Sequence, residues 1–441
     1  HHPRRMTDTL TDHDIEEGEL PEGWESYTLG EVAKWGSGGT PKSGVTRYYG
    51  GDIPWAVIRD LNDDVVLTTE SSITDEGLNE SSAKMIEPGS ILVAMYGSIG
   101  KLGLAGQPMS TNQAIAFANP LSDCIAERFL FYFLMSQREL LLRAGKGATQ
   151  QNISQTILKS WPISVPPLEE QGRIVEILED QLSHLDTARH SLHAVRKKAA
   201  QFRRSLLHAT FTGALTGHDV EEGQLPEGWE LGALEGLLDV SIGGIWGKEE
   251  GTLEVDVDVI RVTELKAHGV INPATAARRS ITHKQLSSRS LQEGDLLLEK
   301  SGGGPKTPVG RVGYIPKLDS ASVCSNFMQL MRPNRERVLP VFLHLFLTGF
   351  HSNGGTVALQ TATTNIRNIK SSEYLATTVP LPSLEEQERI VEILEDQLSR
   401  LDASLAVVDA VEERSEALRR SLLHSAFTGR LTEEWREAVN V

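Results

Sequence analysis

Apolar residues recur at intervals of seven along two long segments of the chain. In the first segment they are Leu178, Leu185, Leu192, Ala199 and Leu206, with Ile174, Ala188, Val195 and Phe202 at the second heptad position. In the second segment the same places hold Leu394, Leu401, Val408, Ser415 and Leu422, with Ile390, Val411 and Leu418. A stripe sustained over about five heptads is typical of a coiled coil. We therefore predict two helices that pair with each other, each about 60 Å long at 1.5 Å per residue. A helix that packs on its own domain is the alternative.

The two segments are copies of one sequence. LEEQGRIVEILEDQLSHLD, from Leu168, recurs as LEEQERIVEILEDQLSRLD, from Leu384, and the 216-residue shift holds to the ends, where RRSLLHATFTGALT matches RRSLLHSAFTGRLT. Upstream, EEGELPEGWE from Glu16 recurs as EEGQLPEGWE from Glu221, a shift of 205. The second unit is therefore about 11 residues longer, and the middles diverge while the ends agree. This pattern predicts a shared scaffold with two different specificities.

Each divergent block mixes short strand signals with one apolar helix. In the first block, strands are expected at IPWAVI, VVLTT and SILVAMY, and a helix of about four turns at ERFLFYFLMSQRELLLRA, from Glu127. The second block repeats this plan with VDVDVIRVTEL, EGDLLLEKS and the helix LPVFLHLFLTGF, from Leu339. The predicted fold class is α+β, as two mixed domains joined by two long helices in an antiparallel coiled coil. Its parts are residues 1–15 (a disordered or tag-derived start), 16–165 (first domain), 166–217 (first helix), 218–381 (second domain), 382–432 (second helix) and 433–441 (tail).

The acidity of the chain is concentrated outside the two blocks. The net charge is −17, yet residues 26–165 carry −2 and residues 231–380 carry +2. Each block could therefore present a basic face to a polyanion. Two cysteines, too few for a disulfide framework, suggest a reducing cytoplasm, and we expect a cytoplasmic protein without a membrane span or signal peptide.

The sequence lacks the common motifs of catalytic sites. GSIGK, from Gly97 to Lys101, resembles a phosphate-binding loop, but Met95 and Leu102 occupy positions where that motif needs glycine and serine or threonine. The sequence contains no GxSxG or HExxH motif and no Cys or His spacing typical of a metal site. We therefore expect a chain that binds rather than catalyses, with no metal and no cofactor of its own.

Three repeated motifs together resemble one known family over essentially the whole chain. They are the helix start PPLEEQ or PSLEEQ, the helix end SLLHxxFTGxLT and the opening LPEGWE; SGGTPKSGVTRYYGGDIPW, from Ser37, adds to them. In this order, and present twice, they resemble the specificity subunits of type I restriction–modification systems. The second domain departs from the family wording, because SIGGIWGKEEG replaces SGGTPKSG.

The resemblance implies two target-recognition domains, each reading one half of a split site in double-stranded DNA through the major groove. The paired helices would fix the spacer and dock two methyltransferase (modification) subunits. Those subunits would bind S-adenosylmethionine and methylate adenine, and restriction subunits using ATP and Mg²⁺ would complete the complex. A rod of the expected length could separate two reading domains by about one turn of DNA, roughly 34 Å.

Candidate DNA contacts follow from side-chain chemistry, since Arg, Lys, Asn and Gln suit base edges, and hydroxyl and basic groups suit phosphates. In the first domain, three polar loops hold Thr40, Lys42, Ser43, Arg47 and Tyr48; then Tyr96, Ser98 and Lys101; then Gln150, Gln151 and Asn152. In the second domain the parallel loops hold Trp246 and Lys248; then Lys300, Lys306 and Arg311; then Thr363, Thr364, Asn365 and Arg367. The alternative roles are a turn capped by Asn152 and, around Gly302, a mobile surface loop without a partner.

Two other classes of function stay open at this point. One is a protein scaffold that carries two interaction modules on a rod and does not touch DNA. The other is an enzyme with an unrecognised site, which a pocket lined by paired carboxylates would support.

Overall fold

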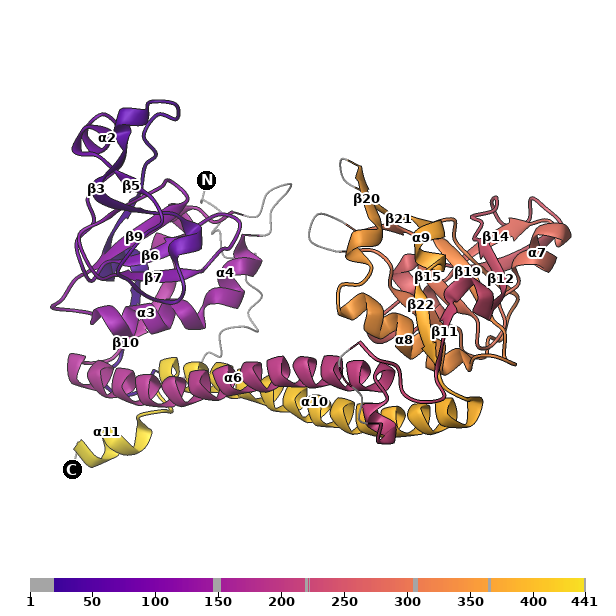
Figure 1. Ribbon diagram of the computed structural model, residues 1–441. Helices are drawn as coiled ribbons and strands as arrows, with labels where there is room; N and C mark the ends of the chain where they lie inside the picture. The colour runs from indigo at the N-terminus through magenta and orange to yellow at the C-terminus, as the bar shows by residue number, and fades with distance from the viewer. Residues whose placement is uncertain are drawn as a thin grey trace. The chain divides into compact units, whose positions relative to one another are not determined.

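The computed structural model describes residues 20–145, 152–218, 221, 223–303, 308–363 and 366–439. They fall into two compact units, His1–Ser191 with Ala410–Val441 (unit 1) and Leu192–Asp409 (unit 2). Each unit contains one divergent block, the first half of one long helix and the second half of the other (Figure 1). The long helices are α6 (Leu168–Phe211) and α10 (Leu384–Phe427).

In unit 1 the block is built on two sheets. The larger has the order β2-β9-β6-β7-β4, formed by Ala33–Ser37, Ile115–Pro120, Ile91–Ala94, Leu102–Ala105 and Asp64–Val66. The smaller has the order β5-β3-β8, formed by Ser72–Ile73, Tyr49–Ala56 and Ser110–Thr111. A further pair, β1 (Glu25–Thr28) and β10 (Pro162–Val165), leads the chain into and out of the block. The helices are α1 (Leu29–Val32), α2 (Asp75–Asn79), α3 (Glu127–Ser136), α4 (Arg138–Ala144) and α5 (Gln155–Lys159).

Unit 2 repeats this topology with different lengths. Its sheets are β12-β19-β15-β17 (Leu238–Gly243, Met328–Pro333, Leu296–Glu299, Val312–Tyr314) and β14-β13-β18 (Ala277–Ile281, Val255–Ile260, Ser322–Cys324). The outer pair is β11 (Glu230–Ala233) with β22 (Thr378–Leu381), and a further sheet joins β16 (Ser301–Gly302), β21 (Ile366–Ile369) and β20 (Gln360–Thr363). The helices are α7 (His283–Arg289), α8 (Pro340–Ser352) and α9 (Ser371–Leu375), while α11 (Glu433–Val439) belongs to unit 1. The α+β prediction is confirmed in both units.

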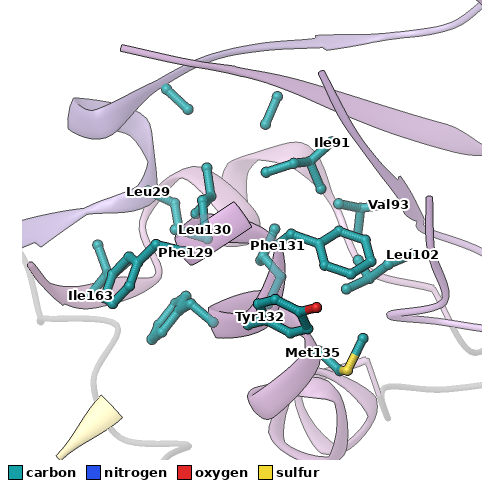
Figure 2. Packing of buried hydrophobic residues seen from close by; sticks show 14 of the residues in the cluster. Leu29, Ile91, Val93, Leu102, Phe129, Leu130, Phe131, Tyr132, Met135 and Ile163 are labelled. Atoms are coloured by element: carbon teal, nitrogen blue, oxygen red, sulfur yellow. The ribbon is translucent and has the colours of Figure 1, made fainter. Parts of the chain in front are cut away.

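The core of unit 1 lies between its sheet and α6, with α3 in the middle (Figures 1 and 2). Every residue of α3 from Phe129 to Met135 is buried, because one side packs on the strands and the other on the long helices. The expected four-turn helix is two helices that meet at Gln137, whose side chain accepts a hydrogen bond from Trp161 Nε1 at 3.2 Å. The strand expected at VVLTT is shorter than predicted and ends at Val66.

The long helices pair antiparallel within each unit. In unit 1, Asp186 of α6 accepts a hydrogen bond from Arg419 of α10 at 2.8 Å. In unit 2, Asp402 pairs with Arg203, the same two repeat positions with their helices exchanged. Arg196 adds a bond to Asp409 at 2.6 Å. The predicted antiparallel coiled coil is confirmed by these reciprocal pairs.

The first position of the heptad stripe is buried or half-buried along both helices, from Leu178 to Leu206 and from Leu394 to Leu422, as predicted, but the second position is not. Ile174, Leu178 and Leu182 are buried at intervals of four against both α3 and the end of α10, so the helix start packs on its own block as well as on its partner helix. Farther along, Val195, Phe202, Val411 and Leu418 are 46–57% exposed. The second heptad position is therefore buried only near the helix starts, where Ile174 and Ile390 pack into the cores of the two blocks, and it is exposed farther along.

A duplicated polar network explains the LPEGW and LEEQ motifs. Trp24 Nε1 donates to Glu170 at 3.1 Å, and Glu170 also binds Thr432 and Arg436. In unit 2, Glu386 accepts hydrogen bonds from Trp229 Nε1 at 3.1 Å and Thr216 at 2.7 Å, and its carboxylate lies 2.9 Å from the His218 ring. Both tryptophans are buried.

The glutamine of the LEEQ motif ties the start of each long helix to its block. Gln171 accepts from the Ala126 backbone N–H at 2.7 Å, and Gln387 accepts from Leu339 N–H at 2.8 Å. These two bonds cap the first turns of α3 and α8 from outside, where the helices have no side-chain cap of their own. The motif is therefore used for folding in both units.

Candidate nucleic-acid interface

Three loops of unit 1 meet at the ends of strands β2, β9 and β6. The loop after β2 donates from Gly38 N–H to Ile115 O and from Gly39 N–H to Thr111 O, at 3.1 and 2.9 Å. Next to it, the Thr40 hydroxyl is hydrogen-bonded to the exposed Gln113 side chain. The sequence expectation therefore placed Thr40 correctly in an exposed loop, beside Lys42 and Ser43, which are exposed as well.

The glycines of this first loop are required by packing. A Cβ on Gly38 would lie 2.2 Å from Thr111 Oγ1, and one on Gly39 would lie 2.3 Å from the Ala83 nitrogen. Any larger residue would push the loop off the strand ends. The glycines thus bring Thr40 to the strand ends rather than serving a ligand directly.

The loop after β6 and the segment before α5 complete the cluster in unit 1. Tyr96 is 44% exposed and forms a β-bridge with Asn152, and Met95 O accepts from Ile153 N–H at 2.9 Å. Ser98 is exposed beside them. Tyr96, Gln113 and Asn152 thus combine one aromatic ring with two amide side chains on one exposed edge, a composition suited to base edges and sugar–phosphate.

Unit 2 assembles the same strand ends with different side chains. Gly244 N–H donates to Met328 O at 3.0 Å, as Gly38 N–H does to Ile115 O, and Lys300 N–H donates to Phe327 O at 2.9 Å, as Met95 N–H does to Ala114 O at 2.9 Å. Ser301 replaces Tyr96, and its hydroxyl donates to Asn368 Oδ1 at 2.6 Å. Phe327, 48% exposed, replaces Ala114.

Trp246 is held on the surface of unit 2 by a cation–π contact. The Arg279 guanidinium lies 4.9 Å from the indole centroid, and Trp246 is 37% exposed. The backbone of the adjacent Lys248 pairs in both directions with Ser280 at 2.9 and 3.0 Å, and the Lys248 side chain is exposed. A fixed indole beside an exposed ammonium group can contact a sugar and a phosphate together.

Four of the predicted contact residues have structural partners in the described part of the chain. Tyr48 is 8% exposed, and Arg47 pairs with Glu76 at 2.6 Å. Lys101 Nζ donates to Ile58 O at 3.3 Å, and Arg311 makes a two-pronged bond to the buried Glu299 at 2.8 and 2.9 Å. This bond raises the pKa of Arg311, so its charge is used to hold strand β15. Their contact with DNA stays a prediction.

Several predicted residues lie outside the described residues, namely Gln150, Gln151, Lys306, Thr364 and Asn365. Thr363 ends β20, and Arg367 lies opposite Gly302 in the β16–β21 pair. Lys300 is half-buried and directly precedes β16, where its backbone O accepts from Ile369 N–H at 2.8 Å. The structure therefore brings Lys300 to the start of the small sheet that contains Arg367.

Sequence reasoning did not single out three residues of these edges as DNA contacts, namely Gln113, Asn368 and Phe327. Asn112 and Gln113 both have partners within the fold: Asn112 Oδ1 accepts from Ala114 N–H at 3.1 Å, and the exposed Gln113 side chain accepts from the Thr40 hydroxyl. Asn368 occupies the place of Asn152, and the shared dipeptide Asn-Ile was the signal that could have found it. Phe327 had no signal, because its exposure depends on the turn before β19.

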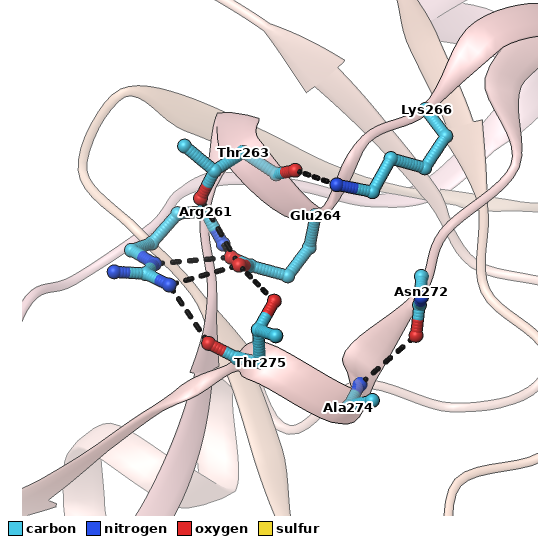
Figure 3. A network of polar contacts seen from close by, with 7 residues as sticks. All are labelled: Arg261, Thr263, Glu264, Lys266, Asn272, Ala274 and Thr275. Atoms are coloured by element: carbon cyan, nitrogen blue, oxygen red, sulfur yellow. Dashed lines mark hydrogen bonds and ion pairs between the residues drawn. The ribbon is translucent and has the colours of Figure 1, made fainter. Parts of the chain in front are cut away.

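Beneath the unit 2 edge, a buried carboxylate ties two short 3₁₀ turns together. Glu264 of η5 (Val262–Glu264) is fully buried and accepts hydrogen bonds from Arg261, Thr263 and Thr275 of η7 (Pro273–Thr275) (Figure 3). Burial opposes ionisation, but these hydrogen bonds outweigh it and lower the pKa of Glu264 to about 2. Such a group stays ionised and cannot act as a general acid near neutral pH.

The described residues contain no group of three or more His, Cys, Asp or Glu side chains arranged to hold a metal ion. Among the same residues, no helix is both long and apolar enough to span a membrane.

The fold and these edges define a class of protein: a chain with two copies of one α+β module, each offering a different set of polar and aromatic loops, joined by a duplicated helical pair. The chain belongs to the type I restriction modification DNA specificity domain family, whose model matches residues 21–194 and 226–405. Each match lies within one of the two repeats and ends inside its long helix.

Characterised relatives match over nearly the whole chain. The EcoBI specificity subunit of Escherichia coli is 23% identical over 95% of this chain and 88% of its own length. The StySPI specificity subunit of Salmonella potsdam is 25% identical over 95% of this chain and 91% of its own length. One chain of a solved structure on assembly and conformational transition of the type I restriction–modification system has a TM-score of 0.71 at 19% identity, covering 94% of this chain and 100% of that chain. This likeness supports the fold.

Proposed function

We propose that this chain is the DNA sequence-specificity subunit of a type I restriction–modification complex, in which each unit reads one half of a bipartite site through the major groove. The observation that carries the proposal is the pair of equivalent exposed edges, Tyr96 with Gln113 and Asn152 in unit 1 against Trp246 with Phe327 and Asn368 in unit 2. Identical strand frames with different side chains are what two half-sites of different sequence require.

The same proposal assigns the long helices to assembly and spacing. The exposed pair Val195 and Phe202 recurs 216 residues later as Val411 and Leu418, so the two helices offer one apolar surface twice. Two copies of the modification subunit fit such a repeat. Methylation with S-adenosylmethionine and cleavage with ATP and Mg²⁺ are assigned to the partner subunits, and this chain is non-catalytic.

The test is binding of the chain, assembled with its modification subunit, to a library of duplexes with two variable half-sites. We expect a split consensus, and an affinity that falls steeply with salt because phosphate contacts release counterions. Gln113→Ala should relax preference in one half-site only, by about 1–3 kcal/mol for a lost amide contact to a base.

The matched control is Glu70→Gln, which removes an exposed ion pair with Arg59 in the same unit and should leave both half-sites unchanged. A complex that selects no split sequence, with binding indifferent to salt, would instead support the scaffold function.

A further inference from the structure

Unit 2 has an apolar groove between α8 and the first half of α10. Two adjoining cavities of about 320 and 290 Å³ share Val341 and Glu395. Leu345 and Val391 add to the apolar floor, and both are half-buried. We call this feature the α8–α10 groove.

One side of the groove is lined by three exposed carboxylates. Glu388, Glu392 and Glu395 follow one another at helical spacing along α10 and all line the second cavity, and Glu395 lines the first as well. Within the described residues, none of the three forms an ion pair. Like charges three or four residues apart destabilise a helix, so a positive group placed here would relieve repulsion as well as gain attraction.

The equivalent place in unit 1 shows which group fits. The Gln171 and Gln387 bonds to the starts of α3 and α8 set the register, in which Arg128 corresponds to Val341 and Tyr132 to Leu345. Arg128 Nε lies 3.7 Å from Glu179, the counterpart of Glu395.

In unit 1, the positions of the other two groove carboxylates hold either a paired carboxylate or no charge. Glu176, the counterpart of Glu392, pairs with Arg173 at 2.6 Å, and Gly172 stands in the place of Glu388. Tyr132 is buried there, whereas Leu345 is half-buried. Unit 1 therefore fills with its own arginine and tyrosine the place that unit 2 leaves open and negative.

We propose that the α8–α10 groove binds a segment of the modification subunit that presents an arginine or lysine beside an apolar side chain, and that unit 2 alone offers this contact. The inference rests on the proposed function, because that function supplies the partner. Its consequence is that the two modification subunits bind unequally: one copy uses only the repeated surface of the long helices, and the other adds the groove.

The experiment titrates the full chain with purified modification subunit and resolves the first and second binding events by mass photometry. Glu392→Gln with Glu395→Gln should weaken one event about tenfold and leave the other unchanged, as expected for loss of about 1.4 kcal/mol. Val341→Arg, which copies Arg128 into unit 2, should fill the groove and weaken the same event by about tenfold or more. The matched control, Glu179→Gln in unit 1, should change neither event.

Thermal unfolding separates these effects from misfolding, since Val341→Arg recreates a pair that unit 1 already contains and should unfold no earlier than the parent. Variants that bind both copies as the parent does, or weaken both events equally, would overturn the groove while leaving bipartite recognition by the parent complex intact. A parent chain that binds no modification subunit would overturn the groove and the proposed function together.

Discussion

Several buried carboxylates of this protein are stabilised by arginine partners. Glu264, Glu299 and Asp295 are all buried, and each faces an arginine: Arg261, Arg311 and Arg332 respectively. All three pairs lie in unit 2 and brace its strand ends and turns. Breaking such a pair from one side leaves an uncompensated buried charge, which costs far more than loss of an exposed pair.

We expect the stability of unit 2 to fall as the pH is lowered from about 4.5 toward 2. The folded-state pKa of Glu264 is about 2, below the ordinary 4.5, so its contribution is present above 4.5 and is lost as the folded carboxylate becomes protonated. The contribution is at most about 3 kcal/mol, from a shift of this size at 1.36 kcal/mol per pKa unit. Urea denaturation of the full chain at a series of pH values between about 2.5 and 7 measures this loss of stability.

Glu264→Gln should lower the urea midpoint at pH 7 and flatten its dependence on pH below 4.5. The control Glu76→Gln alters an exposed pair with Arg47 and should shift stability by less than about 0.5 kcal/mol. A Glu264→Gln variant with the parent's acid sensitivity would show that other carboxylates cause it.

At the scale of elements, each long helix has two apolar surfaces with different uses. Leu178 is fully buried between α3 and the end of α10, and Leu394 has the same place in unit 2. Phe202 and Leu418, at equivalent positions of the two helices, are about half exposed. The buried surface holds each unit together, and the exposed one is available to a partner.

Substitutions on the two surfaces should therefore separate folding from assembly. Leu178→Ala should cost about 2–5 kcal/mol of stability, because it leaves a cavity in a packed core. Phe202→Asp and Leu418→Asp should change stability by less than about 0.5 kcal/mol, yet each should weaken binding of one modification subunit. Thermal unfolding and co-purification with that subunit measure the two effects. Aspartate variants that unfold like Leu178→Ala would show that the exposed surface belongs to the core.

At the scale of the whole molecule, the duplication exchanges equivalent residues between the helices. The pair Asp186–Arg419 in unit 1 becomes Asp402–Arg203 in unit 2, and Glu170 with Thr432 becomes Glu386 with Thr216. Each unit is thus closed by the second half of the helix that begins in the other. Neither repeat of the sequence therefore corresponds to one folded unit. A fragment that contains a single repeat would lack the half-helix that completes its core.

The proposed spacer role predicts the effect of lengthening both helices together. Seven residues inserted after Ser191 and seven after Asp409 keep the heptad register and add about 10 Å to each helix. The preferred spacer between half-sites should grow by about three base pairs at 3.4 Å each, with the half-site bases unchanged. Selection from a library with variable spacers measures this. A change in the half-site bases, with the spacer kept, would mean that the helices take part in base reading.

The sequence by itself determined the duplication, the α+β class and the two long helices, because these depend on local periodicity and on repeats that need no three-dimensional information. It also located the exposed loops at Thr40, Tyr96 and Trp246, since glycine and polar residues mark strand ends. Tertiary structure alone decided that Tyr48 is buried, that Arg311 is held by Glu299, and that Phe327 and Asn368 share an edge, because these depend on strand pairings between distant segments. It also decided which heptad residues are buried, because a helix face is set by whatever packs on it: Leu178 meets α3, whereas Phe202 is left exposed.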